Sequence, residues 1–136
     1  MSKSTIYNSV DDWLNVMVID DQQAMRKIIR QLLHQEHIDH VTEASNGKHA
    51  LEMMRNVDVP EPDVIVCDLY MDVMDGLEFV HHLRRMDDRT PVLILTGEKN
   101  EFVHDVTRQA GASKVLTKPI SALDLAQEIH NAVGAY

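Results

Sequence analysis

The residues best placed to do chemistry in this sequence are aspartates that follow short apolar runs. Asp68 follows "VIVC", and Asp20 and Asp21 follow "VMVI". Carboxylates brought close together raise one another's pKa and destabilise a fold unless a cation neutralises them. Carboxylate and water ligands suit Mg²⁺ better than Zn²⁺. If the chain brings these three aspartates together, the pattern indicates a divalent-cation site.

Two other polar residues also lie at the ends of apolar runs. Thr96, followed by Gly97, ends "VLILT", and Lys118, followed by Pro119, comes after "KVLT". A cation and a lysine can absorb charge on a moving phosphoryl group, while a hydroxyl and backbone N–H groups bind its oxygens. A carboxylate can then attack and form an aspartyl phosphate. This combination favours Asp68 as a residue that receives a phosphoryl group.

Each of these residues also has an ordinary structural explanation. An aspartate at the end of a strand is commonly a cap or a turn former, and the pair Asp20–Asp21 could begin a helix, where negative charge is favoured. Thr96 alone would be a strand end, Lys118 a surface residue and Pro119 a helix-start residue. The chemical interpretation depends on their occurring together at four predicted strand ends.

The elements that would position these residues alternate along the chain. Apolar runs predict strands over 16–20, 40–44, 64–68, 91–96 and 114–117. Helical periodicity, marked in some segments and weaker in others, predicts helices over 25–33, 47–56, 79–86, 100–110 and 125–133. The pairs Asp75 with Glu78 and Ser121 with Asp124 have the spacing of helix-start capping boxes.

This alternation predicts an α/β fold with a five-stranded parallel sheet, helices on both faces and right-handed crossovers. Strands with continuous apolar runs are typical of such a sheet, because both of its faces are buried. Ligands of open parallel sheets bind outside the carboxyl ends of the strands. The polar residues described above are expected at that edge.

Length and composition narrow the class of protein. A chain of 136 residues fits one domain, for which we predict residues 13–136, with a polar extension over 1–12 and no second domain. The net charge of −9 argues against a nucleic-acid partner. No apolar run reaches the length of a membrane span, and the start lacks a signal-peptide core. The single cysteine, Cys67, cannot form an internal disulfide, so we expect a cytoplasmic protein without a membrane partner.

Four motifs together resemble the receiver domain of two-component response regulators, the CheY-like family. They are Asp20–Asp21, "DLYMDVMDG" from Asp68, "LTG" ending at Gly97, and "LTKPI" with Lys118 and Pro119. The phrase "QAGASKVLTKP" is similar to the family's run into its fifth strand. The resemblance covers roughly residues 14–134. It implies a (βα)5 flavodoxin-like fold with strand order 2-1-3-4-5.

The resemblance also implies roles for single residues. Asp68 would be the phosphoacceptor. Asp21, Asp68 and the backbone carbonyl of Tyr70 would ligate Mg²⁺, with Asp20 acting mostly through water.

Three further residues belong to the same implied site. Thr96 would donate a hydrogen bond to a phosphoryl oxygen, Gly97 would offer a backbone N–H beside it, and Lys118 would pair with its charge. The Lys118–Pro119 peptide bond would be cis.

The sequence departs from the family pattern at some positions. Asp72 stands where proline is usual, so the loop is expected to be looser and carries an additional negative charge. Val115 occupies the switch position, where an aromatic residue is common, so the usual inward swing of a ring cannot apply unchanged. Tyr70 and Glu98 occupy positions that in the family tune hydrolysis of the acyl phosphate.

The leading hypothesis is a stand-alone receiver that a histidine kinase or phosphotransfer protein phosphorylates on Asp68 in a Mg²⁺-dependent reaction. The change would be read by a downstream protein at the face of the fourth helix, fifth strand and fifth helix. It would be a signalling protein rather than an enzyme, with slow self-dephosphorylation at most.

Three alternatives remain open from the residues. The first is a receiver-fold docking module with altered switching, which Val115 and Asp72 would allow. The second is a haloacid-dehalogenase-like phosphatase, but that class needs an acid two residues after the nucleophile, where Tyr70 stands. The third is a nucleotide-binding flavodoxin-like module, which the absence of a glycine-rich loop after the first strand disfavours. The eight histidines show no metal-ligand spacing.

Overall fold

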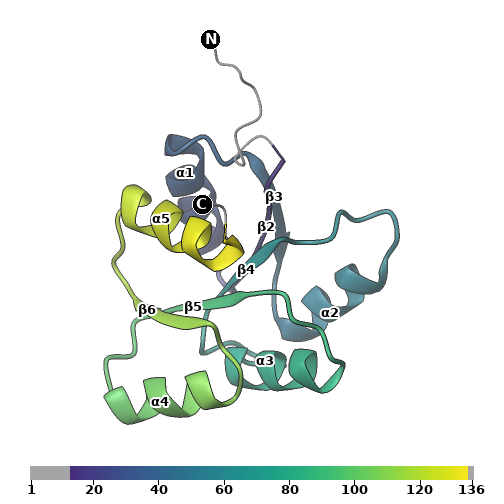
Figure 1. Cartoon of the computed structure of the whole chain (residues 1–136), viewed down its shortest axis with the longest axis vertical. Helices are drawn as coiled ribbons and strands as arrows, with labels where there is room; N and C mark the ends of the chain where they lie inside the picture. The colour runs from purple at the N-terminus through teal and green to yellow at the C-terminus, as the bar shows by residue number, and fades with distance from the viewer. Residues whose placement is uncertain (1–12, 135–136) are drawn as a thin grey trace.

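Strands and helices alternate throughout the part of the chain that the computed structural model describes, residues 13–134 (Figure 1). The strands are β2 (Asn15–Ile19), β3 (His40–Ala44), β4 (Val64–Cys67), β5 (Val92–Thr96) and β6 (Lys114–Thr117). The helices are α1 (Gln23–Gln35), α2 (Gly47–Arg55), α3 (Gly76–Arg85), α4 (Glu101–Gln109) and α5 (Ala122–Val133). The extension predicted for residues 1–12 lies outside the described residues.

The strands form one parallel sheet in the order β3-β2-β4-β5-β6. Counted along the chain this is 2-1-3-4-5, so the predicted fold class and strand order are confirmed. Ile19, the last residue of β2, pairs with Ala44 on one side and with Cys67 on the other. Because these three strands end level, the residues that follow them lie at the same edge of the sheet.

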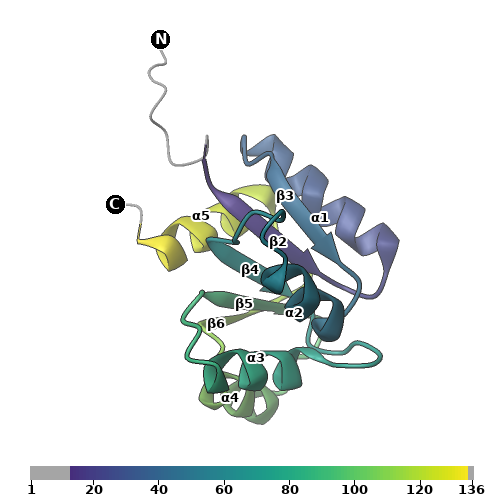
Figure 2. The ribbon, with the colours of Figure 1, turned by 90° about the vertical axis from the view of Figure 1, so that its right-hand side faces the viewer.

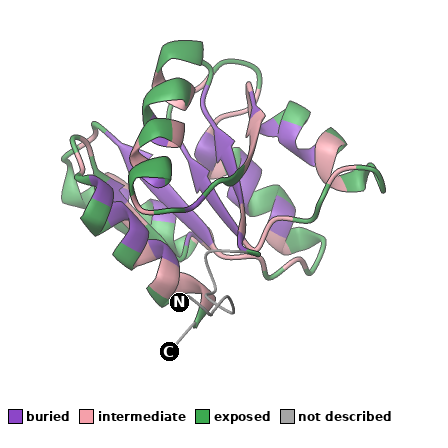
Figure 3. Ribbon diagram, turned by 90° about the horizontal axis from the view of Figure 1, so that it is seen from above, coloured by how far each residue is buried: buried purple, intermediate pink, exposed green. Residues whose placement is uncertain are grey.

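Helices cover both faces of the sheet. The apolar side chains of β2 point alternately to its two sides, as strand geometry requires. Val16 and Val18 pack with residues of α1 and α5, whereas Met17 and Ile19 pack with residues of α2 and α3. Figures 1 and 2 show α1 and α5 together on one face and the other three helices on the opposite face. The central strands are therefore buried on both sides (Figure 3).

The helix starts follow the predicted caps. Asp75 accepts a hydrogen bond from the backbone N–H of Glu78 at 2.9 Å, and Ser121 accepts one from Asp124 at 3.1 Å. The less marked helices, α2 and α4, begin at the asparagine caps Asn46 and Asn100. None of the helices within residues 13–134 combines the length and apolar character needed to cross a membrane.

Candidate functional site

An acidic cluster lies at the carboxyl edge of the sheet. Asp20 and Asp68 each stand one residue beyond a strand, and their N–H groups continue the ladder to the carbonyls of Ala44 and Ile19 at 3.2 and 2.9 Å. One carboxylate oxygen from each of Asp20, Asp21 and Asp68 lies within 4.8 Å of the others. Asp20 is buried, Asp68 is partly buried and Asp21 is exposed, so the cluster opens to solvent on one side.

Asp20 supplies the observation that bears most directly on a cation. Its Oδ1 accepts a hydrogen bond from the backbone N–H of Gln22 at 2.9 Å. Its Oδ2 is buried without any hydrogen bond. A buried carboxylate oxygen is costly unless it is paired or coordinates a metal. The three carboxylates with this unsatisfied oxygen therefore fit a hard, oxygen-liganded cation such as Mg²⁺.

Lys118 is a basic side chain that approaches the carboxylate oxygens of the cluster, whereas Arg26 donates to the backbone carbonyl of Asp20 at 2.6 Å. Its backbone N–H donates to the carbonyl of Thr96 at 2.8 Å, which places it at the same edge. Its Nζ lies 3.5 Å from Asp20 Oδ2 and 3.6 Å from Asp68 Oδ2. Both distances exceed those of ordinary N–H···O hydrogen bonds. One ammonium between two carboxylates cannot balance the cluster alone. The Lys118–Pro119 peptide bond is cis.

Asp68 stands in a partly desolvated position. Burial raises the pKa of Asp68 above its ordinary value, and the charge of Asp20 raises it further. Lys118 and the Leu69 N–H, which donates to Oδ1 at 2.8 Å, act in the opposite direction but do not cancel the rise. A cation at the cluster would favour the ionised form that can act as a nucleophile.

The start of α3 packs against the backbone of Asp68. A Cβ added to Gly76 would lie 2.3 Å from the Asp68 carbonyl oxygen. The N–H of Gly76 donates to the carbonyl of Leu69 at 2.8 Å, which closes the loop after Asp68. The glycine is therefore required by this close approach.

Asp72 and Val73 form a tight turn in this loop. The Asp72 N–H lies 3.3 Å from Asp21 Oδ2, and the Met74 N–H donates to the Asp72 carbonyl at 2.8 Å. Val73 between them has a φ of 70°. The Met74 carbonyl accepts from the N–H of Gly47 at 3.2 Å, so hydrogen bonds hold the loop although it lacks the family's proline.

Tyr70 reaches from this loop to the segment that follows β5. Its hydroxyl donates to Glu98 Oε1 at 2.5 Å. Glu98 Oε2 accepts from the N–H groups of Lys99 and Asn100 at 3.1 and 3.0 Å. The hydrogen bond between the two side chains raises the pKa of Tyr70 and lowers the pKa of Glu98. The loop after Asp68 and the loop after β5 are thus connected by a side-chain hydrogen bond.

Thr96 and Gly97 occupy the end of β5, between the strands that precede Asp68 and Lys118. Thr96 is fully buried, and its Oγ1 accepts from the N–H of Glu98 at 3.1 Å. A Cβ added to Gly97 would meet nothing within 4 Å, so the backbone there faces open space. The three acids, one hydroxyl and one lysine predicted to converge all lie at this one edge; they are residues 20, 21, 68, 96 and 118.

Sequence reasoning missed His104. This histidine of α4 is buried, and its Nε2 lies 2.6 Å from the Glu98 carbonyl oxygen. The buried positions of α4 are His104 and Thr107, which are both polar. The helix therefore lacks a strong apolar stripe, and its histidine could not be distinguished by type from those on the surface.

The chain belongs to the response regulator receiver domain family, whose model matches residues 16–130. Among curated proteins, it is 31% identical to the chemotaxis protein CheY of Halobacterium salinarum over 104 residues. That match covers 76% of this chain and 83% of CheY. It is also 31% identical to the alkaline phosphatase synthesis transcriptional regulatory protein PhoP of Bacillus subtilis, but covers only 42% of PhoP. Several curated relatives, PhoP among them, are more than twice as long as the region that they share with this chain.

Solved structures agree with this family. The receiver domain of the Francisella response regulator 1452 superposes with a TM-score of 0.80 at 29% identity, covering 90% of this chain and 98% of that one. The Vibrio cholerae chemotaxis protein CheY4 gives a TM-score of 0.77 at 29% identity, with 88% and 98% covered. The chain is therefore a receiver domain of two-component signalling with the flavodoxin-like fold. Its acidic cluster is the kind of pocket at which receiver domains bind Mg²⁺.

Proposed function

We propose that the protein is a phosphorylation switch in which Asp68 accepts a phosphoryl group from a histidine kinase or phosphotransfer protein. The unsatisfied buried oxygen of Asp20, inside a group of three carboxylates, is the observation that carries this proposal. Asp20, Asp21 and Asp68 would hold Mg²⁺, together with the backbone carbonyl of Tyr70. The receiver domain we propose comprises residues 13–136, which contain the matched region.

The reaction would be a transfer between two protein side chains. A carboxylate oxygen of Asp68 forms a bond to phosphorus, while the bond from phosphorus to the donor imidazole nitrogen breaks. That nitrogen keeps the electron pair and regains a proton, and the product is an acyl phosphate. When bound, Mg²⁺ would neutralise negative charge on the carboxylates and on the phosphoryl oxygens.

Residues of this chain would hold the product. The Nζ of Lys118, already 3.6 Å from Asp68 Oδ2, would pair with a phosphoryl oxygen. The Thr96 hydroxyl would donate to a second oxygen, and the N–H of Gly97, a residue whose added Cβ would meet nothing within 4 Å, would donate beside it. Such groups stabilise charge that develops on the phosphoryl oxygens.

We infer that the protein does not turn over a phosphate ester. A phosphatase of the haloacid-dehalogenase type would place an acid two residues after the nucleophile. Tyr70 occupies that position, and its hydroxyl is engaged with Glu98. Loss of the phosphoryl group from Asp68 would then occur by slow hydrolysis, with both side chains near the path of the attacking water.

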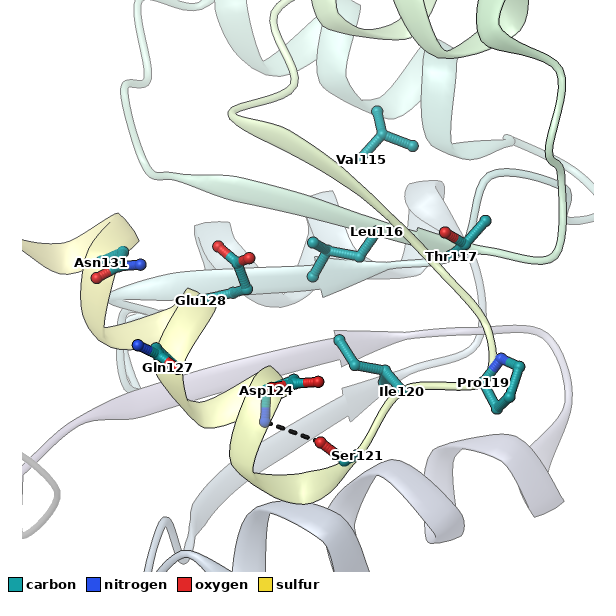
Figure 4. A pocket seen from close by; sticks show the side chains of 10 residues that line it. All are labelled: Val115, Leu116, Thr117, Pro119, Ile120, Ser121, Asp124, Gln127, Glu128 and Asn131. Carbon is teal, nitrogen blue, oxygen red and sulfur yellow. Dashed lines mark hydrogen bonds between the residues drawn. The ribbon is translucent and has the colours of Figure 1, made fainter.

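A downstream protein would read the switch at α4, β6 and α5. A groove of about 450 Å³ runs along β6 and along α5 as far as Asn131, with Asp124 and Glu128 in its lining (Figure 4). On α4, Phe102 is 75% exposed. The carboxylates of this groove, of which Glu128 is paired with Lys114, and the exposed aromatic side chain on α4 suit a protein partner better than nucleic acid. The cytoplasm is the compartment in which we place this exchange.

The proposal is tested with a small phosphodonor. Wild-type protein and Asp68→Asn are incubated with acetyl phosphate and Mg²⁺, and intact masses are measured. The expected result is one added phosphoryl group on the wild type and none on Asp68→Asn, with the addition prevented by EDTA. Equal behaviour of the two proteins, or turnover of a generic phosphate ester that Asp68→Asn abolishes, would overturn the proposal.

A further inference from the structure

A buried histidine ties α4 to the segment beside the phosphoacceptor. His104 Nε2 lies 2.6 Å from the carbonyl oxygen of Glu98, and a carbonyl can only accept. The ring must therefore carry a hydrogen on Nε2 and donate it. The other nitrogen, Nδ1, is 3.8 Å from an oxygen of Glu101, which is exposed. The bond from His104 to Glu98 joins a helix to the loop after β5.

Glu98 is connected to the site as well as to α4. Its N–H donates a hydrogen bond to Thr96 Oγ1 at 3.1 Å, and its carboxylate accepts a hydrogen bond from the hydroxyl of Tyr70. Its backbone and side chain thus touch the strand that carries Thr96, the loop that carries Asp68, and helix α4. Glu98 is therefore hydrogen-bonded to all three of these elements.

Val115 offers no comparable connection. It is partly buried on β6 and packs with the apolar cluster under α2, α3 and α4. Its branched side chain has only two methyl groups and no donor or acceptor, and its χ1 is stiff. A side chain of this size cannot move into and out of a groove as a ring could, so a response of α4 needs another route.

We propose that His104 is a positioning residue that, by holding Glu98, carries a change at Thr96 to helix α4. This inference rests on the proposed function, because the change at Thr96 is its movement toward a phosphoryl group on Asp68. When the Thr96 hydroxyl turns toward that group, the hydrogen bond that it accepts from the Glu98 N–H is strained or lost. The Glu98 backbone adjusts, and its carbonyl moves the bonded imidazole and the first turns of α4 with it.

The experiment compares His104→Leu, which removes the donor, with His104→Gln, whose amide Nε2 can reach the same carbonyl. Val106→Ala is the control on the same helix, since Val106 is 37% exposed and its side chain has no group that could form a hydrogen bond with Glu98. Backbone amide shifts of each protein are recorded with Mg²⁺ before and after addition of beryllofluoride, a phosphoryl mimic.

We expect the wild type, His104→Gln and Val106→Ala to show shift changes at Leu69 and Glu98 and also along the first turns of α4. His104→Leu should keep the changes at Leu69 and lose at least half of their size in α4. A role that depended on packing of the imidazole ring would not be restored by glutamine, whereas a role that depends on the hydrogen bond to Glu98 would be. Undiminished changes in α4 of His104→Leu would overturn the inference, as would loss in His104→Gln equal to that in His104→Leu.

Two further measurements distinguish failure of the proposed function from failure of the inference about His104. Absence of any change at Leu69 in the wild type would count against the proposed function, and the inference would fall with it. If His104→Leu does not fold, the wild type alone decides: its imidazole Nε2–H resonance should shift on addition of beryllofluoride. An unchanged resonance, together with changes at Leu69 and in α4, would show that the signal takes another route.

Discussion

Val73 holds a backbone conformation that its own side chain disfavours. With a φ of 70°, it is a β-branched residue in the left-handed region, where a Cβ approaches the following carbonyl, and asparagine is better tolerated. We predict that Val73→Asn raises the free energy of unfolding by about 1 kcal/mol. Chemical denaturation of both proteins measures this difference.

A matched control separates backbone strain from surface polarity. Val57 is 96% exposed, Val73 is 73% exposed, and only Val73 has a positive φ. Val57→Asn should leave stability within about 0.5 kcal/mol of the wild type. A gain of equal size in both variants would show that the strain at Val73 does not matter.

Asp68 gives a prediction on pH. Burial raises the folded-state pKa of Asp68 above the ordinary value of about 3.9, so the folded protein binds this proton more tightly than the unfolded chain does. The ionised carboxylate therefore destabilises the fold at pH above the raised pKa. Asp68→Asn should melt at a higher temperature than the wild type at pH 7 in metal-free buffer. This increase in melting temperature should shrink as the pH falls through the raised pKa, and it should vanish below the ordinary pKa of an aspartate. An increase that does not depend on pH would contradict the prediction.

At the scale of elements, the start of α3 is fixed against the residue that it positions. A methyl group at Gly76 would lie 2.3 Å from the Asp68 carbonyl, which is backbone and cannot turn aside. We predict that Gly76→Ala costs about 2 kcal/mol of stability, as backbone strain commonly does. Thermal or chemical unfolding checks it. Gly97→Ala is the control, because its methyl group would meet nothing within 4 Å; similar losses in both variants would refute the close-approach explanation.

The elements could largely be predicted from the sequence, for physical reasons that differ among them. β2, β4 and β5 are buried on both faces, so their apolar runs are continuous and easily recognised. β3 lies at the sheet edge and is mostly only partly buried, which explains its weaker pattern. The buried residues of α4 are the polar His104 and Thr107, so a search for apolar periodicity finds only a weak pattern in this helix.

The site could be predicted where it depends on strand ends. Residues that follow parallel strands reach a common edge, which is why Asp20, Asp68 and Lys118 could be brought together from the sequence. The bridge from Tyr70 to Glu98 could not, since it joins side chains from different loops whose paths are set by tertiary packing. The unsatisfied Oδ2 of Asp20 likewise becomes visible only when burial is known.

At the scale of the whole molecule, the site joins two strands that are distant in sequence, so a bound cation should stabilise the entire fold. A ligand that binds only the folded state raises the free energy of unfolding with its concentration. We predict that Mg²⁺ raises the melting temperature of the wild type and raises that of Asp21→Asn much less. Asp58→Asn, which removes an exposed acid outside the cluster, should respond as the wild type does. Equal responses of all three proteins would indicate non-specific charge screening.

The most direct test of the shared cation site uses Mn²⁺, which accepts the same oxygen ligands as Mg²⁺ and broadens nearby NMR signals by its paramagnetism. Substoichiometric Mn²⁺ is added to the labelled protein, and the loss of each backbone amide signal is measured. We predict that Asp21, Asp68 and Leu69 lose intensity first, that Val57 and Met86 keep theirs, and that excess Mg²⁺ restores the spectrum. Broadening centred on another acidic surface, or broadening of Asp21 without Asp68, would contradict a cation held jointly by the ends of β2 and β4.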